Sequence, residues 1–429
     1  MRSGLNEPST AAAAAVDEAR LWQALMDLAA IGARSDGGVC RHALSDEDIE
    51  ARALVIGWAE ARGYEVSVDE AANLFIRRAG RDSAAAPVLT GSHLDSQPAG
   101  GKFDGAYGVL AGLEALKALD DAGIETTRPI DVVAWTNEEG GRFDRSCTGS
   151  SVWSGATELE SYFGDTGADG VPLGVALAKT LAATPDLPRR PRQWMPHAAI
   201  EIHIEQGPVL EAEGVSIAAV TGIQGVRWMN VEVSGKAGHA GTTPMAGRQD
   251  AVQGALSAIA GLNALMADPQ DRVRFTVGRL NVTPNSPNTI PEQVLFSIDF
   301  RHPDRDLLED RTGRIAEIVR DAAAPCATLV MPTLSMDPTP FPESMIATIE
   351  ASAEALNLGC IRLASGAFHD ALYMAQVCPT AMIFIPCRGG LSHHPAEWAE
   401  PRHCAEGARV LAAALVELAE ADGGLRPSA

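Results

Sequence analysis

The chain has 429 residues, 46% of them hydrophobic, which is enough for a large core and favours two domains. Its 34 Lys and Arg against 56 Asp and Glu give a formal net charge of -22, which argues against nucleic-acid and anionic-membrane partners. Seven scattered cysteines without a C-x-x-C pair, and no apolar run long enough to cross a membrane, favour a cytoplasmic protein with reduced thiols.

Short apolar runs alternate with helical patterns through the first half of the chain. Strands are expected in the stretches APVLTGSH, PIDVVAWTNEEG and AAIEIHIEQG, and helical spacing is found in DGAYGVLAGLEALKALDDAG. Strands that alternate with helices predict the α/β class, with a largely parallel mixed sheet flanked by helices. Functional sites in such sheets lie at the carboxyl ends of the strands.

The stretch from residue 225 to 336 follows a different order, which begins with VRWMNVEVSG and ends with CATLVMP. Between them we expect a helix, two strands (VRFTVGRLNV and EQVLFSIDFRH) and a second helix. The order β-α-β-β-α-β is typical of a compact, ferredoxin-like unit. We therefore predict a discontinuous catalytic domain, residues 1–224 and 337–429, and an inserted domain of residues 225–336.

Polar side chains follow several of the expected strands. In the Gly-rich stretch GSHLDSQPAGGKFDGAYG, His93 can bind a metal, the Asp104 carboxylate can bridge two cations, and Asp95 can hydrogen-bond the His93 ring. The alternative is a polar loop in which Asp104 caps the next helix. The pair Glu138 and Glu139 indicates one metal ligand and one general base, or else a solvated turn.

Two further strand ends carry imidazoles. His203 lies in the expected strand EIHIEQGP, where a satisfied, partly buried side chain is the more common role. His393 and His394 follow the apolar run TAMIFIP, and because adjacent side chains point in different directions we expect only one to bind a metal. Together these residues provide the oxygen and imidazole donors of a two-metal zinc or manganese site.

The motifs GSHLDSQPAGGKFDGAYGVLAGLEAL, TNEEGGRF, HIEQGPVLE, GHAGTTPM, PNSPNTIP, FSIDFRH, SGAFHDA and LSHHPAEW resemble the N-carbamoyl-L-amino-acid hydrolases. These enzymes share a branch with allantoate amidohydrolases and β-ureidopropionases, within the superfamily of aminoacylases and dinuclear-metal carboxypeptidases. The resemblance implies two divalent metal ions per subunit, either zinc or else manganese, cobalt or nickel. Its implied ligands are His93 and His203 for one ion, Glu139 and His393 for the other, and Asp104 as the bridge.

The resemblance also implies roles in catalysis and substrate binding. Glu138 would be the general base, Asp95 is counted with it among the catalytic residues, and His239 would reach into the active site of the partner subunit of a homodimer. A small ureido or amide substrate with a carboxylate would be bound by Gln206, Asn288, Arg301, Ser365 and Gly366. From the residues alone, Arg301 is equally well a surface side chain, and His239 a loop histidine.

Two positions depart from the family pattern. Phe368 in SGAFHDA replaces a small residue, and His394 in LSHHP stands where Asn is common. The predicted reaction converts an N-carbamoyl-L-amino acid to the L-amino acid, ammonia and carbon dioxide. The alternatives are allantoate, β-ureidopropionate or N-acyl-amino-acid hydrolysis at the same site. A non-catalytic binding protein on this scaffold is also considered, but the presence of both Glu138 and Asp104 argues against it.

Overall fold

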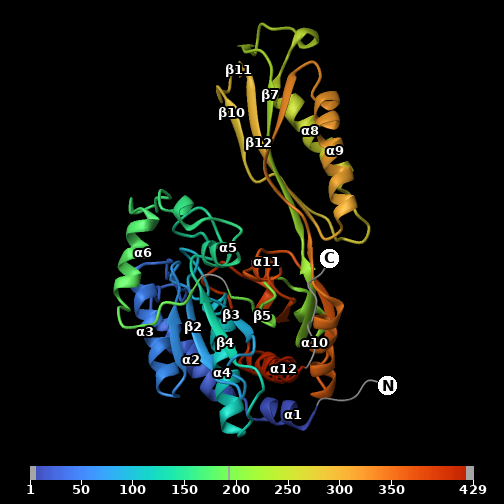
Figure 1. The fold of residues 1–429 in the computed structure, drawn as a ribbon. Helices are drawn as coiled ribbons and strands as arrows, with labels where there is room; N and C mark the ends of the chain where they lie inside the picture. The colour runs from blue at the N-terminus through green and yellow to red at the C-terminus, as the bar shows by residue number, and fades with distance from the viewer. Residues whose placement is uncertain (1–5, 192–193, 422–429) are drawn as a thin grey trace. The chain divides into compact units, whose positions relative to one another are not determined.

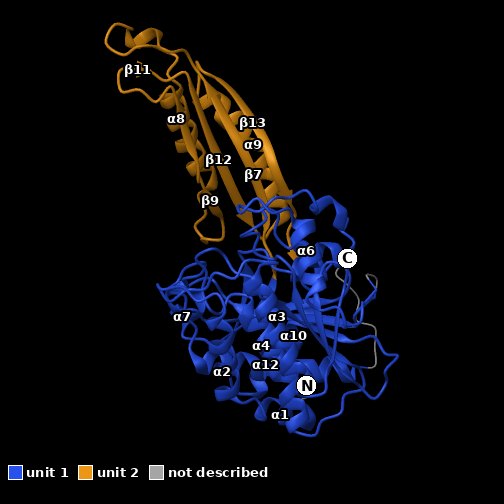
Figure 2. Cartoon of the chain, turned by 90° about the vertical axis from the view of Figure 1, so that its left-hand side faces the viewer, with its two compact units in different colours: residues 1–221, 340–429 blue, residues 222–339 orange. Residues whose placement is uncertain are grey.

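A computed structural model describes residues 6–191 and 194–421 of the chain (Figure 1). The chain divides into two compact units (Figure 2): unit 1 comprises residues 1–221 and 340–429, and unit 2 comprises residues 222–339. Unit 2 begins and ends three residues outside the inserted domain predicted from the sequence. Within the described ranges, no helix is long and apolar enough to cross a membrane.

Unit 1 is built on one mixed sheet, in which nine strands are described. The strands are β1 (Glu65–Val68), β2 (Leu74–Arg78), β3 (Val88–His93), β4 (Ile130–Trp135), β5 (Ala198–Ile204), β6 (Ile217–Ile223), β14 (Thr339–Pro340), β15 (Cys360–Ser365) and β16 (Thr380–Ile385). Their order is β1-β2-β4-β3-β5-β16-β6-β14, with β15 paired to β6. The neighbours β4, β3, β5 and β16 run parallel and are buried throughout, as is typical of strands covered on both faces.

Helices pack against this sheet and position one of its loops. They are α1 (Glu7–Ala14), α2 (Glu18–Ala30), α3 (Asp46–Glu60), α4 (Ala106–Asp121), α5 (Thr148–Ser154), α6 (Leu173–Ala182), α7 (Val209–Glu213), α10 (Glu343–Ala355), α11 (Ala371–Met374) and α12 (Pro401–Glu420), with short 3-10 turns η1 (Leu159–Tyr162) and η3 (Arg388–Gly390). Helices α4 and α12 contact each other and strands β3 and β5 (Figure 1). The approach of α4 is close, because a Cβ at Gly108 would lie 2.5 Å from the carbonyl oxygen of Ile202. Since α4 begins two residues after Asp104, this packing also positions Asp104.

Unit 2 has its own antiparallel sheet and two helices. Its elements are β7 (Gly225–Ser234), β8 (Gly238–His239), η2 (Met245–Gly247), α8 (Ala251–Met266), β9 (Arg274–Thr276), β10 (Leu280–Thr283), β11 (Thr289–Ile290), β12 (Gln293–His302), α9 (Arg305–Ala322) and β13 (Ala327–Met336). The sheet order is β10-β12-β7-β13, with β9 also paired to β12, and β8 pairs with β11. Phe296 and Phe300 lie in its buried core. The stretch VRFTVGRLNV, expected as one strand, is split into β9 and β10 around Gly278, a residue type that weakens strand interiors.

Candidate active site

The candidate metal ligands come from the carboxyl ends of neighbouring parallel strands in unit 1. Strand β3 ends at His93, and His203 is the penultimate residue of β5. The Glu138–Glu139 pair follows β4, and His393 lies in the loop after β16. Because these four strands are parallel neighbours, their carboxyl ends lie along one edge of the sheet (Figure 1). Together with Asp104, from the loop before α4, all five predicted ligands are brought together.

His93, Asp104 and His203 form a first ligand group, whose ligand atoms lie within 4.8 Å of one another. Asp104 Oδ1 lies 3.0 Å from His203 Nε2 and 3.5 Å from His93 Nε2. His203 Nδ1 lies 2.9 Å from the backbone carbonyl oxygen of Ile204, and His93 Nδ1 lies 2.9 Å from the backbone carbonyl oxygen of Asp95. A ring that donates its Nδ1–H to a carbonyl carries its lone pair on Nε2, which is the tautomer that binds a metal.

Asp104, Glu139 and His393 form a second ligand group. His393 Nε2 lies 3.2 Å from Glu139 Oε2 and 3.5 Å from Asp104 Oδ2. Gln97 fixes the Glu139 carboxylate, because its backbone N–H and its side-chain amide donate to Oε1 and Oε2 at 3.1 and 2.8 Å. The two oxygens of Asp104 therefore face different groups, Oδ1 the first and Oδ2 the second. This is the arrangement of a carboxylate that can bridge two cations.

The structure distinguishes the two adjacent histidines. His393 has a φ of 53°, in the left-handed region, and its ring reaches the second ligand group. His394 is exposed, and its Nδ1 accepts the backbone N–H of Ala396 at 3.0 Å. Of the two, His393 is therefore the residue placed to bind a metal.

The charges at this edge of the sheet suit cations. Burial raises the pKa of Glu138 well above its usual value and raises the pKa of Asp95 to about 6. Burial acts to lower the pKa of His93, but the charge of Glu138 and the other nearby carboxylates outweighs it and raises that pKa. The hydrogen bond to Glu139 raises the pKa of His393 to about 9. The crowded carboxylates thus attract positive charge, and a set of carboxylate and imidazole donors suits zinc or manganese.

Glu138 belongs to neither ligand group. Its Oε2 lies 3.4 Å from His93 Nε2, and the Cys147 thiol donates to its Oε1 across 3.7 Å. The prediction that the Asp95 carboxylate hydrogen-bonds the His93 ring is wrong. The Asp95 carboxylate oxygen lies 3.8 Å from His93 Nδ1, which is beyond hydrogen-bonding distance. The Asp95 backbone carbonyl takes the ring N–H instead. The carboxylate accepts the backbone N–H groups of Glu138 and Glu139, each at 3.2 Å, and so positions that pair.

Gln206, one of the residues predicted to bind substrate, lies beside the Asp104 carboxylate. Its Nε2 donates to Asp104 Oδ2 at 2.7 Å. Its Oε1 is buried and has no hydrogen-bond partner among the described residues. This oxygen can therefore accept a hydrogen bond from a ligand.

The segment SGAFHDA, which carries the predicted substrate residues Ser365 and Gly366, begins at the last residue of β15. Ser365 is buried and its hydroxyl bonds the backbone of Ala367, whereas Gly366 is exposed. Phe368 is partly buried and precedes the buried His369. The His369 ring packs edge-on against the His203 ring, with 4.7 Å between ring centroids, so this segment reaches the first ligand group.

His239, Asn288 and Arg301 belong to unit 2, whereas the metal candidates belong to unit 1. His239 is exposed on β8, and the carbonyl oxygen of Asn288 accepts the N–H of the residue after it, Ala240, at 3.0 Å. Arg301 donates from Nε and Nη2 to the two carboxylate oxygens of Asp299, at 2.9 and 2.8 Å. The Arg301 guanidinium, which is predicted to bind a substrate carboxylate, thus pairs with the carboxylate of Asp299 on its own strand.

The sequence analysis missed three residues that hold the candidate ligands in place. Gln97 binds Glu139, Ser392 donates to Asp104 Oδ2 at 2.8 Å, and Glu397 accepts the backbone N–H of Asp104 at 3.1 Å. All three lie inside the motifs quoted above. The only sequence signal that could have found Glu397 is that an acidic residue lies close to the histidine pair. An acidic residue in such a position is by itself typical of a solvated turn.

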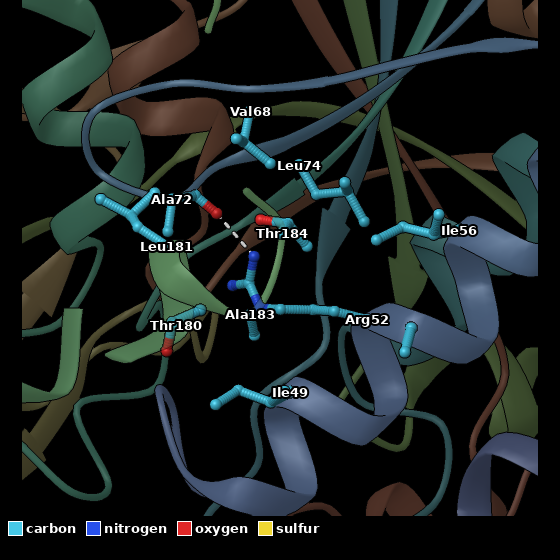
Figure 3. A pocket seen from close by; sticks show the side chains of 11 residues that line it. Ile49, Arg52, Ile56, Val68, Ala72, Leu74, Thr180, Leu181, Ala183 and Thr184 are labelled. Atoms are coloured by element: carbon cyan, nitrogen blue, oxygen red, sulfur yellow. Dashed lines mark hydrogen bonds between the residues drawn. The ribbon is translucent and has the colours of Figure 1, made fainter. Parts of the chain in front are cut away.

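A small cavity of about 40 Å³ lies elsewhere in unit 1, lined mainly by apolar side chains such as Ile56 and Leu74 (Figure 3). None of its lining residues is a predicted site residue. Its one charged side chain, Arg52, pairs with Asp48 and donates to Thr136 Oγ1 at 3.1 Å. Because Thr136 directly follows β4, Arg52 supports the strand end that carries the two glutamates.

Comparison with known proteins identifies the family. Residues 89–417 match peptidase family M20/M25/M40. The chain belongs to this family. Within it, the N-carbamoyl-L-amino-acid amidohydrolase of Rhizobium meliloti is 40% identical over 410 residues, which cover 94% of this chain and 97% of that protein. The allantoate amidohydrolase of Escherichia coli (strain K12) is 35% identical over 408 residues, which cover 94% and 98%.

A solved structure agrees with this assignment. The crystal structure of an amidase of the hydantoinase/carbamoylase family from Burkholderia multivorans has a TM-score of 0.89 and 44% identity, and covers 94% of this chain and 98% of that chain. The resemblance seen in the sequence is confirmed, as is the prediction of a hydrolase that acts on carbon–nitrogen bonds. The mixed α/β fold of this M20 family member is also as predicted.

Proposed function

We propose that this chain is a metal-dependent amidohydrolase that cleaves the carbamoyl carbon–nitrogen bond of N-carbamoyl-L-amino acids. The products would be the L-amino acid, ammonia and carbon dioxide. The observation that carries the proposal is that two ligand groups share Asp104 beside the carboxylate of Glu138, which belongs to neither. The substrate class is supported by 40% identity to an N-carbamoyl-L-amino-acid amidohydrolase.

Two divalent ions, zinc or else manganese, cobalt or nickel, would be held by the two ligand groups. When bound, these ions would supply Lewis-acid chemistry, which acidifies water and polarises a carbonyl group. The fit is supported by the donor set and by the ring orientations of His93 and His203, whose Nε2 atoms face Asp104. Gly105 N–H donates to His203 Nε2 at 3.0 Å, which requires the same tautomer.

The chain's own residues would move the proton and stabilise charge. Glu138 would accept a proton from the attacking water and later deliver it to the leaving nitrogen. Asp95 would keep the main chain of Glu138 in place through its hydrogen bond to that N–H group. His239 would donate a hydrogen bond to the developing oxyanion, an effect worth about 3 to 4 kcal/mol for one such donor.

Five residues are proposed to bind substrate. Gln206 Oε1 would accept an N–H of the ureido group, because this buried atom has no partner within the described chain. Arg301 suits bidentate recognition of the substrate carboxylate, which would compete with Asp299 for the guanidinium. Asn288, Ser365 and Gly366 would complete the binding site.

We further propose that unit 2 is a dimerisation and lid domain and that the working unit is a homodimer completed by His239 of the partner. The proposal is supported by the exposed position of His239 and by the edge strands β10 and β13, since edge strands need pairing or protection. We propose a cytoplasmic location, which the seven free cysteines support, and no nucleic-acid or membrane partner.

Allantoate hydrolysis is a second candidate function, because the same site suits any ureido group and the E. coli allantoate amidohydrolase is 35% identical. The test is a panel of N-carbamoyl-L-amino acids, allantoate and N-acetyl-L-amino acids, assayed by product release with the metal-loaded enzyme. The proposal predicts the highest kcat/KM for an N-carbamoyl-L-amino acid. Higher kcat/KM for allantoate would establish the second function, and no turnover of any ureido compound would refute both.

A further inference from the structure

Glu397 ties together two loops that carry metal-ligand candidates. It is 2% exposed, and its Oε1 accepts the backbone N–H groups of Phe103 and Asp104 at 3.0 and 3.1 Å. A Cβ at Gly101 would lie 2.1 Å from the Glu397 carboxylate, so the side chain packs directly on this backbone. Since Glu397 lies four residues after His393, its carboxylate connects the Asp104 loop to the His393 loop.

Two neighbours of Glu397 make parallel connections. The Ser392 hydroxyl lies 2.8 Å from Asp104 Oδ2 and 3.1 Å from Glu397 Oε2, so it stands between the two carboxylates. The Trp398 ring packs against the Phe103 ring, with 5.7 Å between centroids. The chain on both sides of His393 is thus attached to the segment that contains Asp104.

The two ligand groups differ in how they are held. In the first group, His93 and His203 lie on buried strands and their side chains are at most 1% exposed. In the second group, His393 lies on a loop, with a φ of 53° and a side chain that is 50% exposed. No strand fixes His393, so its distance from Asp104 depends on the connections made by its own loop.

We propose that Glu397 is a positioning residue that fixes His393 relative to Asp104 and thereby controls binding of the second metal ion but not of the first. The inference rests on the proposed two-metal function. The backbone N–H groups of Phe103 and Asp104 require an acceptor oxygen at the end of a side chain as long as that of Glu. A Gln at this position retains a carbonyl oxygen at that reach, and its amide can donate to Ser392, whose hydroxyl then donates to Asp104. An Asp retains the charge but is one methylene shorter.

The experiment measures metal binding directly. Protein stripped with a chelator is titrated with Zn²⁺ and, separately, Mn²⁺ by calorimetry, and the ions per chain are counted by elemental analysis. We expect two ions in the wild type. In Glu397→Ala and Glu397→Asp the second ion should bind about 10- to 100-fold more weakly, with the first within about threefold of the wild type. Glu397→Gln should restore most of the affinity for the second ion.

Two further variants separate positioning from a general loss of structure. Glu114→Ala is the matched control, because Glu114 is also buried and accepts the backbone N–H of a distant residue, Asp17, at 2.8 Å. It should keep both ions. Ser392→Ala removes only the hydroxyl between the two carboxylates and should weaken the second ion alone, which keeps the inference testable if Glu397→Ala fails to fold.

The possible outcomes are distinct. Binding of two ions with unchanged affinity by Glu397→Ala and Glu397→Asp would overturn the inference. A variant series in which Asp retains the second ion and Gln loses it would also overturn it, because charge and not reach would then be the requirement. If the wild type itself binds fewer than two ions, the two-metal function fails, whatever the role of Glu397.

Discussion

Replacing Glu138 with Gln tests the proposed proton transfer most directly. The substitution keeps the size of the side chain and the backbone bond to Asp95, but the amide cannot accept the proton from water. Glu138 lies outside both ligand groups, so the variant should retain its metal ions. The amide oxygen can still accept the Cys147 thiol, which lies 3.7 Å from Glu138 Oε1. The structure therefore predicts a loss of catalysis without a loss of fold or metal.

The size of the effect follows from the role assigned to this carboxylate. A positioned acid or base contributes about 100- to 10,000-fold, or roughly 2.7 to 5.4 kcal/mol of transition-state stabilisation. We expect kcat for an N-carbamoyl-L-amino acid to fall by at least about 100-fold, with KM within about threefold. Ammonia release and metal content are measured together, and Glu205→Gln, which changes a half-buried carboxylate that binds the start of α7, is the control. Near-normal turnover in Glu138→Gln with metal retained would show that the base is another group.

Three further outcomes are expected. Removal of metal by a chelator should abolish turnover and Zn²⁺ or Mn²⁺ should restore it; full activity in protein shown to hold no metal would exclude the proposed site. Phe368→Gly should change the ranking of substrates in the panel more than the highest rate, whereas an unchanged ranking would assign Phe368 to the core. Mixing the inactive variants His239→Ala and Glu138→Gln under subunit exchange should restore activity, because a mixed dimer has one intact site. Confirmed exchange without activity would rule out a shared site.

The sheet of unit 1 could be predicted from local patterns because each of its central strands contains a short apolar run. Strands β3, β4, β5 and β16 are of this kind, and each is buried throughout. The division of VRFTVGRLNV into β9 and β10 could not be predicted in the same way. There apolar and polar side chains alternate on both sides of Gly278, and although the alternation shifts by one position across it, only the pairing of both parts with β12 shows where each strand ends.

The candidate ligands could be predicted because a strand end is a local feature, visible as a polar residue after an apolar run. The residues that hold them are defined by contacts between distant parts of the chain. Glu397 bonds the N–H of Asp104 across 293 positions, and Gln97 bonds Glu139 across 42. The ion pair between Arg301 and Asp299 could not be predicted from the sequence either. The alternation of side chains places both residues on one face of β12 but does not show that they bond.

One short segment connects the parts of the site that must act together. From His93 to Gln97, the chain supplies a ligand of the first group, a carboxylate that holds the backbone of Glu138 and Glu139, and an amide that holds the Glu139 carboxylate. Glu138, the proposed base, is therefore fixed relative to both ligand groups by one continuous stretch of backbone. The loop of His393 has no such link to Glu138 among the described residues, since its ring contacts run to Asp104 and Glu139. A change at Asp95 should therefore impair proton transfer and metal binding together, whereas a change in the His393 loop should impair the second ion and leave the base in place.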